Sequence, residues 1–145
     1  MRILFLIGLM ATLIQICWSQ IINVSNCTDL QNIILNNDTI VYNMTQDLYC
    51  NSSQYTTIGN SSSFAFKGRL QGNFFSIFDL NIISNSKYLA MFGYGMGSSV
   101  YDLKINNLII DSSNIQYAAS LFAYCQNCKF YFTTIYKIIS NEKEK

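Results

Sequence analysis

The sequence predicts an all-β protein, a parallel β-helix (β-solenoid) of few coils that follows a signal peptide and a short N-terminal capping helix. Three observations predict this fold class. From Phe64 onwards, short apolar alternations are broken by Gly, Asn and Ser, with no apolar pattern of helical length. Like residues recur at fixed offsets of 23 and 30 positions. Polar turns, rather than crossover helices, join the recurring units.

Residues 1–19 have the order of a secretory signal peptide, with a basic residue first, an apolar stretch from Ile3 to Ile16, and small side chains before the cleavage site. The apolar stretch is shorter than the roughly 20 residues that a helix needs to cross a bilayer. We therefore expect cleavage after Ser19 and a secreted or cell-surface protein. The alternative is an uncleaved membrane anchor that extends over residues 18–22.

Removal of the signal peptide changes the charge balance. The whole chain carries nine Lys and Arg residues and eight Asp and Glu residues. Loss of Arg2 leaves eight basic residues against eight acidic ones, so the mature chain has a net charge of zero. Because nucleic acids and anionic membranes are bound by clustered Lys and Arg, this balance excludes both as partners. We expect an extracellular protein or a glycan instead.

By composition the chain divides into four segments, which are the signal peptide at 1–19, an N-terminal cap at 20–63, the β-helix coils at 64–139 and a charged tail at 140–145. The cap combines a short helix, a strand and polar turns. It also holds all six glycosylation sequons, at Asn23, Asn26, Asn37, Asn43, Asn51 and Asn60. This placement predicts a sugar-coated N-terminal half and a barer C-terminal half.

Four cysteines remain once Cys17 is removed with the signal peptide, and they are Cys27, Cys50, Cys125 and Cys128. An even number in an oxidising compartment predicts two disulfides. Of the three pairings we favour Cys27 with Cys50 and Cys125 with Cys128. The alternative for the Cys-Gln-Asn-Cys pair is a redox site or half of a zinc site. A redox site of this kind opens a helix, however, and zinc needs two more ligands.

The cap begins with a predicted short helix. Thr28 to Gln31 have the spacing of a helix capping box. The apolar residues that follow share one helical face, namely Leu30, Ile33 and Ile34. A β-branched and aromatic run at 39–45 predicts the first strand, and the Ser-, Asn- and Thr-rich region up to Ser63 predicts turns.

An internal repeat decides the fold prediction. Ser-Ile-Phe-Asp-Leu-Asn-Ile at 76–82 matches Ser-Val-Tyr-Asp-Leu-Lys-Ile at 99–105 in identity or character, at one offset of 23. Stacked strands lie about 4.8 Å apart. This offset therefore predicts interior ladders of like side chains, with Ile77 under Val100, Leu80 under Leu103 and Ile82 under Ile105.

A second recurrence has an offset of 30 and places Phe92-Gly-Tyr94 over Phe122-Ala-Tyr124. The same offset carries four further residues to their equivalents, Val100 to Phe130, Tyr101 to Tyr131, Ile105 to Ile135 and Ile109 to Ile139. Each unit is one supersecondary turn long, and turns bury their apolar residues by stacking. A β-sandwich, the rival all-β fold, gives no reason for residues to repeat in kind at a fixed offset.

The coils also resemble a known family. The segments Phe66-Lys-Gly68-Arg-Leu70-Gln-Gly72-Asn73, Ile77 with Asp79-Leu80, Leu89-Ala-Met-Phe92-Gly93 and Val100-Tyr-Asp-Leu103 are similar to the GLUG-type repeats of secreted right-handed β-helix proteins. The resemblance covers residues 26–132. It departs from the family in Met91-Phe92 where Leu-Phe is usual, in Asp at the Asn-Leu position, and in having few repeats. It implies a right-handed, pectin-lyase-like solenoid that serves as an adhesin-like scaffold, with no catalytic residues common to the family.

The absence of histidine excludes Ser-His and Cys-His nucleophile activation and removes the commonest metal ligand. One constellation remains, Asp79 with Asp102, which the 23-residue offset would stack about 5 Å apart. Two carboxylates that close could hold Ca²⁺ or act as the acid and nucleophile of a retaining glycosidase. We favour two solvated turn residues over either site, and we rank Ca²⁺ binding above catalysis.

Glycines and aromatics each allow two interpretations. Gly93, Gly95 and Gly97 match neither phosphate-binding spacing, so we interpret them as turn glycines. Six aromatics could form a carbohydrate-stacking face, although we favour a core or shielding role for them. They are Phe74, Phe75, Phe78, Tyr101, Tyr124 and Tyr131.

The sequence therefore predicts neither an enzyme nor a cofactor. We expect a non-enzymatic extracellular or cell-surface β-helix module, adhesin-like or scaffolding, that packs against further β-helix repeats or self-associates through its C-terminal edge. The charges at 142–145 would guard that edge. The first alternative is a polysaccharide-active enzyme of pectin-lyase-like architecture. The second is a signal-anchored membrane protein.

Overall fold

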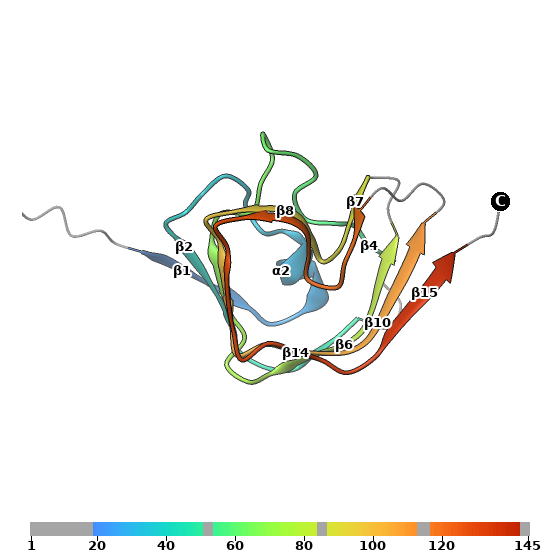
Figure 1. Cartoon of the computed structure of the whole chain (residues 1–145). Coiled ribbons are helices and arrows are strands. Elements are labelled where there is room, and N and C mark those ends of the chain that lie inside the picture. The colour runs from blue at the N-terminus through green and yellow to red at the C-terminus, as the bar shows by residue number, and fades with distance from the viewer. Residues whose placement is uncertain (1–18, 51–53, 84–86, 113–116, 143–145) are drawn as a thin grey trace, which may run out of the picture.

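A computed structural model describes residues 19–50, 54–83, 87–112 and 117–142 of the chain (Figure 1). The expected signal peptide, the sequon at Asn51 and the last three residues of the charged tail lie outside the described residues. Within them the chain is mostly β, with one short helix, and it coils into a β-solenoid of about three turns. The predicted fold class is confirmed.

The first turn is formed by the segment that was expected to be a cap. Its elements are β1 (Gln20–Val24), α2 (Cys27–Gln31), β2 (Ile40–Met44), β3 (Leu48–Tyr49) and β4 (Gln54–Tyr55). β1 and β2 pair in parallel, with Gln20 opposite Ile40. Residues 20–63 therefore supply strands to the same sheets as the later coils.

The later turns repeat one order of strands. The second turn contains β5 (Arg69–Gln71), β6 (Ser76–Ile83), β7 (Tyr88–Leu89) and β8 (Phe92–Met96). The third contains β9 (Ser99–Tyr101), β10 (Lys104–Ser112), β11 (Tyr117–Ala118) and β12 (Phe122–Gln126). A final, partial turn contains β13 (Lys129–Tyr131), β14 (Thr134–Ile135) and β15 (Ile138–Glu142).

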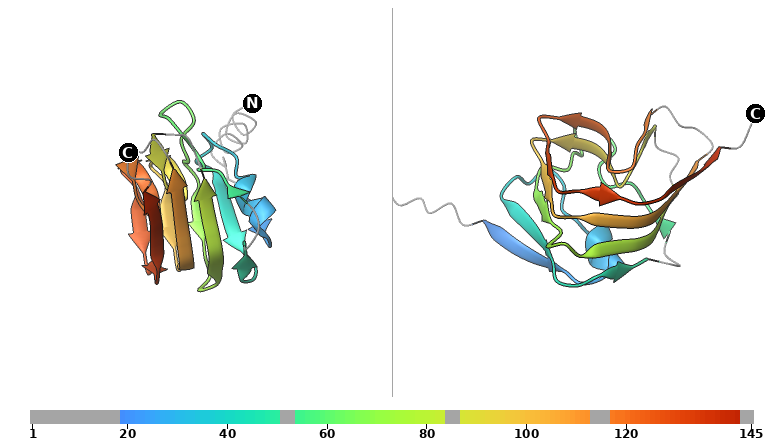
Figure 2. Two further views of the ribbon diagram at one scale, coloured as in Figure 1. Left: turned by 90° about the vertical axis from the view of Figure 1, so that its right-hand side faces the viewer. Right: turned by 60° about the horizontal axis from the view of Figure 1, so that its bottom comes forward.

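Parallel sheets run along the solenoid, and every pair of named strands is parallel (Figure 2). The first sheet has the order β1-β2-β5-β9-β13. The second has the order β14-β10-β6-β3, with β15 also on β10 and β4 also on β6. β7 with β11, and β8 with β12, form two smaller sheets. From β2 onwards, each strand therefore pairs with a strand of the neighbouring turn.

The register confirms the 30-residue recurrence. Its six predicted pairs are all direct partners, namely Phe92 with Phe122, Tyr94 with Tyr124, Val100 with Phe130, Tyr101 with Tyr131, Ile105 with Ile135, and Ile109 with Ile139. The same sheets extend backwards, because Leu70 pairs with Val100 in turn. One interior ladder therefore runs through Leu70, Val100 and Phe130.

The ladders predicted from the 23-residue offset are wrong. Ile77 lies in the second sheet and pairs with Ile105, whereas Val100 lies in the first sheet. Leu80 pairs with Leu108 instead of Leu103, and Ile82 pairs with Ile110 instead of Ile105. The two matching heptads therefore belong to different sheets.

A shared corner geometry explains why the two heptads look alike. Asp79 has φ 53° and Asp102 has φ 50°, so both adopt the left-handed conformation that Asp and Asn tolerate best among residues with a Cβ. Each is followed by a leucine, Leu80 or Leu103, that is 0% exposed. The motif apolar-aromatic-Asp-Leu thus bends the chain and returns it to the core. It occurs at two different corners, which the sequence alone does not distinguish.

Helix α2 closes the N-terminal end of the core. Viewed down the solenoid, it lies inside the outline of the coils (Figure 1), and its Leu30 is 0% exposed. The N-cap is Asn26, whose Oδ1 accepts a 2.8 Å hydrogen bond from the Asp29 amide, so the cap predicted at Thr28 is two residues too late. The Asp29 carboxylate accepts hydrogen bonds from the amide and hydroxyl of Ser25 at 2.9 and 2.8 Å. These bonds lower the pKa of Asp29.

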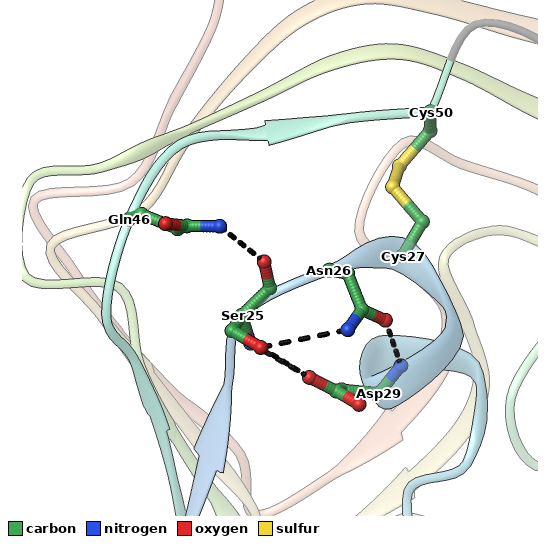
Figure 3. The surroundings of a disulfide bond; sticks show 6 residues. All are labelled: Ser25, Asn26, Cys27, Asp29, Gln46 and Cys50. Atoms are coloured by element: carbon green, nitrogen blue, oxygen red, sulfur yellow. Dashed lines mark hydrogen bonds between the residues drawn. A yellow bond between two sulfur atoms is a disulfide. The ribbon is translucent and has the colours of Figure 1, made fainter.

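Both favoured disulfides have cysteines at disulfide distance. Cys27, the first residue of α2, is bonded to Cys50 at the end of the β3 segment, with 5.7 Å between Cα atoms (Figure 3). Cys125 is bonded to Cys128, with 5.9 Å between Cα atoms. The first bond closes a separation of 23 residues, and loop entropy assigns it about 3 kcal/mol. This bond links α2 to the segment that follows β3. The second bond links the end of β12 to the residue before β13.

Two tyrosines are buried in the core, and they differ in whether the hydroxyl group is hydrogen-bonded. Tyr42 is 1% exposed, and its hydroxyl accepts from the Ile34 amide at 2.9 Å and donates to the Ile34 carbonyl at 3.3 Å. Tyr55 is 2% exposed, but its hydroxyl has no hydrogen-bond partner among the described residues. Burial raises the pKa of Tyr55 well above its ordinary value, because nothing stabilises the phenolate there.

These contacts predict opposite effects for one chemical change. Tyr42→Phe should lower the free energy of unfolding by about 1–2 kcal/mol, because both polar groups of Ile34 lose their partner. Tyr55→Phe should leave the free energy unchanged or raise it, because it removes a buried unsatisfied hydroxyl. Urea unfolding of the two variants beside the wild type measures both.

The pH dependence of the free energy of unfolding provides a control for the Tyr55 prediction. Because the folded state disfavours ionisation of Tyr55, this group does not alter the free energy of unfolding below about pH 10 and lowers it as the pH rises beyond that value. The Tyr55→Phe variant should lose less stability than the wild type over this alkaline range. A Tyr55→Phe variant as destabilised as Tyr42→Phe would contradict the described environment of Tyr55.

Candidate functional site

The C-terminal end of the solenoid exposes residues that are buried one turn earlier. Val100 is 0% exposed, whereas its direct partner Phe130 is 48% exposed. Leu108 is 0% exposed, whereas its partner Ile138 is 54% exposed. Among the described residues no strand covers the outer edge of β13 or β15. The apolar interior therefore continues to the surface at this end, which we call the open end.

The N-terminal end differs, because α2 and the first disulfide cover it (Figure 3). Gln46 also holds the segment before α2 in place, because its Nε2 donates a 2.6 Å hydrogen bond to the Ser25 carbonyl. The described sequons lie at this end too, since Asn23, Asn26, Asn37, Asn43 and Asn60 all precede β5. Asn23 and Asn43 are partners in neighbouring strands, 3.4 Å apart between Oδ1 and Nδ2. The two ends of the solenoid thus have different surfaces.

Four tyrosines gather on the flank formed by β7, β8, β11 and β12. Tyr88 stacks on Tyr117 with 5.3 Å between ring centroids, and Tyr94 stacks on Tyr124 at 4.5 Å. The two stacks meet edge to face, with Tyr88 and Tyr94 5.7 Å apart. In addition, the Lys87 ammonium lies 4.8 Å from the centroid of the Tyr88 ring. We call this set the tyrosine cluster.

The rings nearest the open end are the exposed members of the tyrosine cluster. Tyr117 is 45% exposed and Tyr124 is 42% exposed, because no strand of the described residues lies over their outer faces. Burial raises the pKa of Tyr94, and the neighbouring Tyr124 raises it further. Sequence reasoning named Tyr124 but missed Tyr88 and Tyr117, whose signal was a recurrence at an offset of 29.

A second aromatic stack lies on the outer face of the first sheet. Tyr101 and Tyr131 are parallel, with 4.9 Å between ring centroids. The guanidinium of Arg69, one turn earlier, lies 5.5 Å from the centroid of the Tyr101 ring. Basic and aromatic side chains therefore already associate on this face.

The remaining predicted aromatics do not form one face. Phe78 stacks on Tyr49 at 4.8 Å, on the outside of the second sheet. Phe75 is partly buried and packs against the core. Phe74 is 62% exposed at a corner, where its φ is 63°. The structure thus assigns shielding, core and corner positions to these three residues.

Asp79 and Asp102 are not brought together. Asp79 Oδ1 accepts a 2.5 Å hydrogen bond from Asn107 Nδ2, which occupies the equivalent corner of the next turn. Asp102 Oδ2 accepts from Gln71 Nε2 at 3.3 Å, at the other corner. The pair proposed for Ca²⁺ or glycoside chemistry rested on the 23-residue register, so it falls with that register. Among the described residues there is no group of three or more His, Cys, Asp or Glu that could hold a metal ion.

The glycine-rich segment lies mostly within a strand. Gly93 and Gly95 belong to β8, and only Gly97 sits at a turn, with φ 65°. A Cβ at Gly93 would collide with the Gly59 carbonyl of the previous turn. The interpretation as turn glycines is therefore right for Gly97 alone, and close approach of backbones accounts for Gly93.

Clefts on the described surface include one at the N-terminal end and one on the first sheet. One of about 190 Å³ adjoins the first disulfide and is lined by Cys27, Thr28, Gln31, Asn32, Cys50, Gln54 and Tyr55. The other, of about 240 Å³, crosses the first sheet and is lined by Ser19, Asp38, Ile40, Val41, Lys67, Gly68, Arg69, Gly97 and Ser99. Each has at most one carboxylate, so neither offers the paired acids of a glycosidase.

No protein-family model matches this chain, and no curated protein sequence or solved structure matches it either. The most distinctive surface of the solenoid is the open end, together with the aromatic rings that border it.

The separation of the two aspartates predicts that calcium has no effect on stability. Addition of Ca²⁺ or of a chelator should leave the melting temperature unchanged, because the two carboxylates bind Asn107 and Gln71 at different corners. Differential scanning calorimetry with and without each addition measures this. A melting temperature that rises with Ca²⁺, and no longer does so in Asp79→Asn, would contradict the corner assignment.

Proposed function

We propose that this chain is an exported, non-enzymatic β-solenoid module, adhesin-like or scaffolding, that binds another macromolecule through its open end. One observation carries the proposal. The interior ladder ends on Phe130, which is 48% exposed, although its partner one turn earlier is completely buried. Exposed apolar surface next to unpaired strand edges is a template for association.

Several features of the chain support an extracellular location. The order of residues 1–19 is that of a signal peptide. The cysteines lie at disulfide distance, which suits an oxidising compartment. The described sequons all precede β5, so glycans attached to them would leave the open end accessible. None of the described helices is long and apolar enough to cross a membrane.

The GLUG-type assignment also belongs to this proposal. Its support is that the motif glycines have steric reasons in this fold. A Cβ at Gly72 would lie 2.5 Å from the Asp102 carbonyl oxygen of the next turn, and one at Gly68 would lie 3.0 Å from the Ile40 carbonyl oxygen. Both positions therefore require the close backbone approach that the repeat motif implies.

A second candidate function is glycan binding without cleavage at the tyrosine cluster. The half-exposed rings of Tyr117 and Tyr124 offer flat apolar faces bordered by hydroxyl groups. Tyr124→Ala should then abolish binding to an immobilised polysaccharide, whereas Tyr49→Ala, at a distant exposed ring, should not.

The exported, non-enzymatic character is tested with the full chain expressed in a eukaryotic secretory host. We expect protein in the medium that begins at Gln20, loses mass on enzymatic deglycosylation, and yields no product from a panel of neutral and acidic polysaccharides. Mass spectrometry and a reducing-end assay provide the readouts. Retention of residues 1–19 in a membrane fraction would support the anchored alternative. Product formation lost in Asp79→Asn or Asp102→Asn would support the enzyme.

A further inference from the structure

We propose that the partner of the open end is a second copy of this chain, joined tail to tail by antiparallel pairing of β13 with the partner's β13 about a two-fold axis at Phe130. This inference rests on the proposed function, because it names the occupant of the same surface. It predicts a closed dimer whose two cores form one continuous solenoid.

The difference between the two ends determines how copies can meet. Helix α2 and the first disulfide cover the N-terminal end, and the described sequons cluster in the first turn. An open end placed head to tail on another copy would meet β1, an edge strand whose Ile21 is 68% exposed, but its apolar interior would then face α2 instead of a second uncovered core. Contact between two open ends, by contrast, covers the apolar interior of both copies. Such an interface uses the same patch on both copies, so it closes as a dimer instead of growing into a filament.

The backbone of β13 supplies the hydrogen bonds. Lys129 donates its amide to the Ser98 carbonyl at 3.0 Å, and the Tyr131 carbonyl accepts from the Asp102 amide at 2.9 Å. Both residues therefore direct their polar groups towards the turn below. Because residues alternate along a strand, the amide and carbonyl of Phe130 point to the free edge. Two copies related by a two-fold axis at Phe130 then exchange two reciprocal hydrogen bonds through this residue.

In the same two-fold arrangement, each copy covers the exposed apolar interior of the other. Phe130 extends the ladder of Leu70 and Val100, both 0% exposed, and is itself 48% exposed. Residues directly opposite in an antiparallel pair lie on the same face of the sheet. The partner's Phe130 would therefore cover this ring from above, as the ring covers Val100 from the other side.

The outer face is complementary in the same register. A two-fold axis at Phe130 places Lys129 opposite the partner's Tyr131, so the lysine does not face its own copy. The ammonium can then lie against a ring that already stacks on Tyr101 at 4.9 Å. Within one chain, the guanidinium of Arg69 already lies 5.5 Å from the centroid of the Tyr101 ring. The dimer would repeat this contact with lysine.

Corners on both sides fix the length and register of the pairing. β13 is three residues long; Asn127, two residues before it, has φ 56°, and Phe132, directly after it, has φ 50°. Left-handed corners interrupt the extended backbone, so pairing cannot slide beyond them. Of the antiparallel registers, only the one centred on Phe130 pairs all three residues.

The central test is sedimentation of the secreted, glycosylated full chain over a range of concentrations. We expect a monomer–dimer equilibrium. Phe130→Asp should weaken it at least about tenfold, because it sets two carboxylates against each other in an apolar contact. The matched control is Phe74→Asp, which removes a ring that is 62% exposed at a corner of the second turn and should leave the equilibrium unchanged.

Cysteine cross-linking tests the register without removing the dimer. Phe130→Cys should form an intermolecular disulfide on mild oxidation, because directly paired residues have Cα atoms about 5.5 Å apart. Lys129→Cys alone should not cross-link, because its partner position is Tyr131. An equimolar mixture of Lys129→Cys and Tyr131→Cys should yield the heterodimer. Equal cross-linking of all three single variants would overturn the register.

The outcomes separate this inference from the proposed function. A wild-type chain that is monomeric at every concentration overturns the dimer. If that monomer binds the apolar dye ANS, and Phe130→Asp abolishes the binding, the open end still stands as a surface for another partner. If it binds no dye, the proposed function falls as well. Concentration-dependent growth into filaments would also overturn the dimer, because it requires head-to-tail contact.

Discussion

Parallel hydrogen bonding between successive turns is the constraint on which the rest of this structure depends. A single turn is too thin to bury its apolar side chains, and it becomes stable only when another turn lies against it. The pairing of Leu70, Val100 and Phe130 shows this directly, because the first two are completely buried and the last is not. Sequence repetition, core formation and exposed edges all follow from that one requirement.

The two ends of the solenoid meet this requirement in different ways. At the N-terminal end, α2 inserts Leu30 into the core, and Asn26, Asp29 and the Cys27–Cys50 bond hold the helix in place (Figure 3). At the C-terminal end, the described residues provide no equivalent plug. The exposed ladder and the free ring faces of Tyr117 and Tyr124 are consequences of this asymmetry. The proposed interaction surface is therefore the place where apolar side chains stay uncovered among the described residues.

The fold class was predictable, whereas the register was only half predictable. The 30-residue recurrence compares residues in equivalent strands, where packing selects the same side chain, so its pairs were right. The 23-residue recurrence compares two corners, where left-handed Asp79 and Asp102 impose the same local pattern on different sheets. The pairing of these two aspartates failed for that reason. The tyrosine cluster was partly missed because the turn between β10 and β11 changes the offset to 29.

The most direct test of the central claim is a pair of double-mutant cycles. Ile77→Ala combined with Ile105→Ala should show a coupling free energy of about 0.5 kcal/mol or more, because these side chains lie directly above one another. Ile77→Ala combined with Val100→Ala should be closer to additive, because these residues belong to different sheets. Urea unfolding of each single and double variant provides the values. Stronger coupling between Ile77 and Val100 than between Ile77 and Ile105 would contradict the stacking described for this chain.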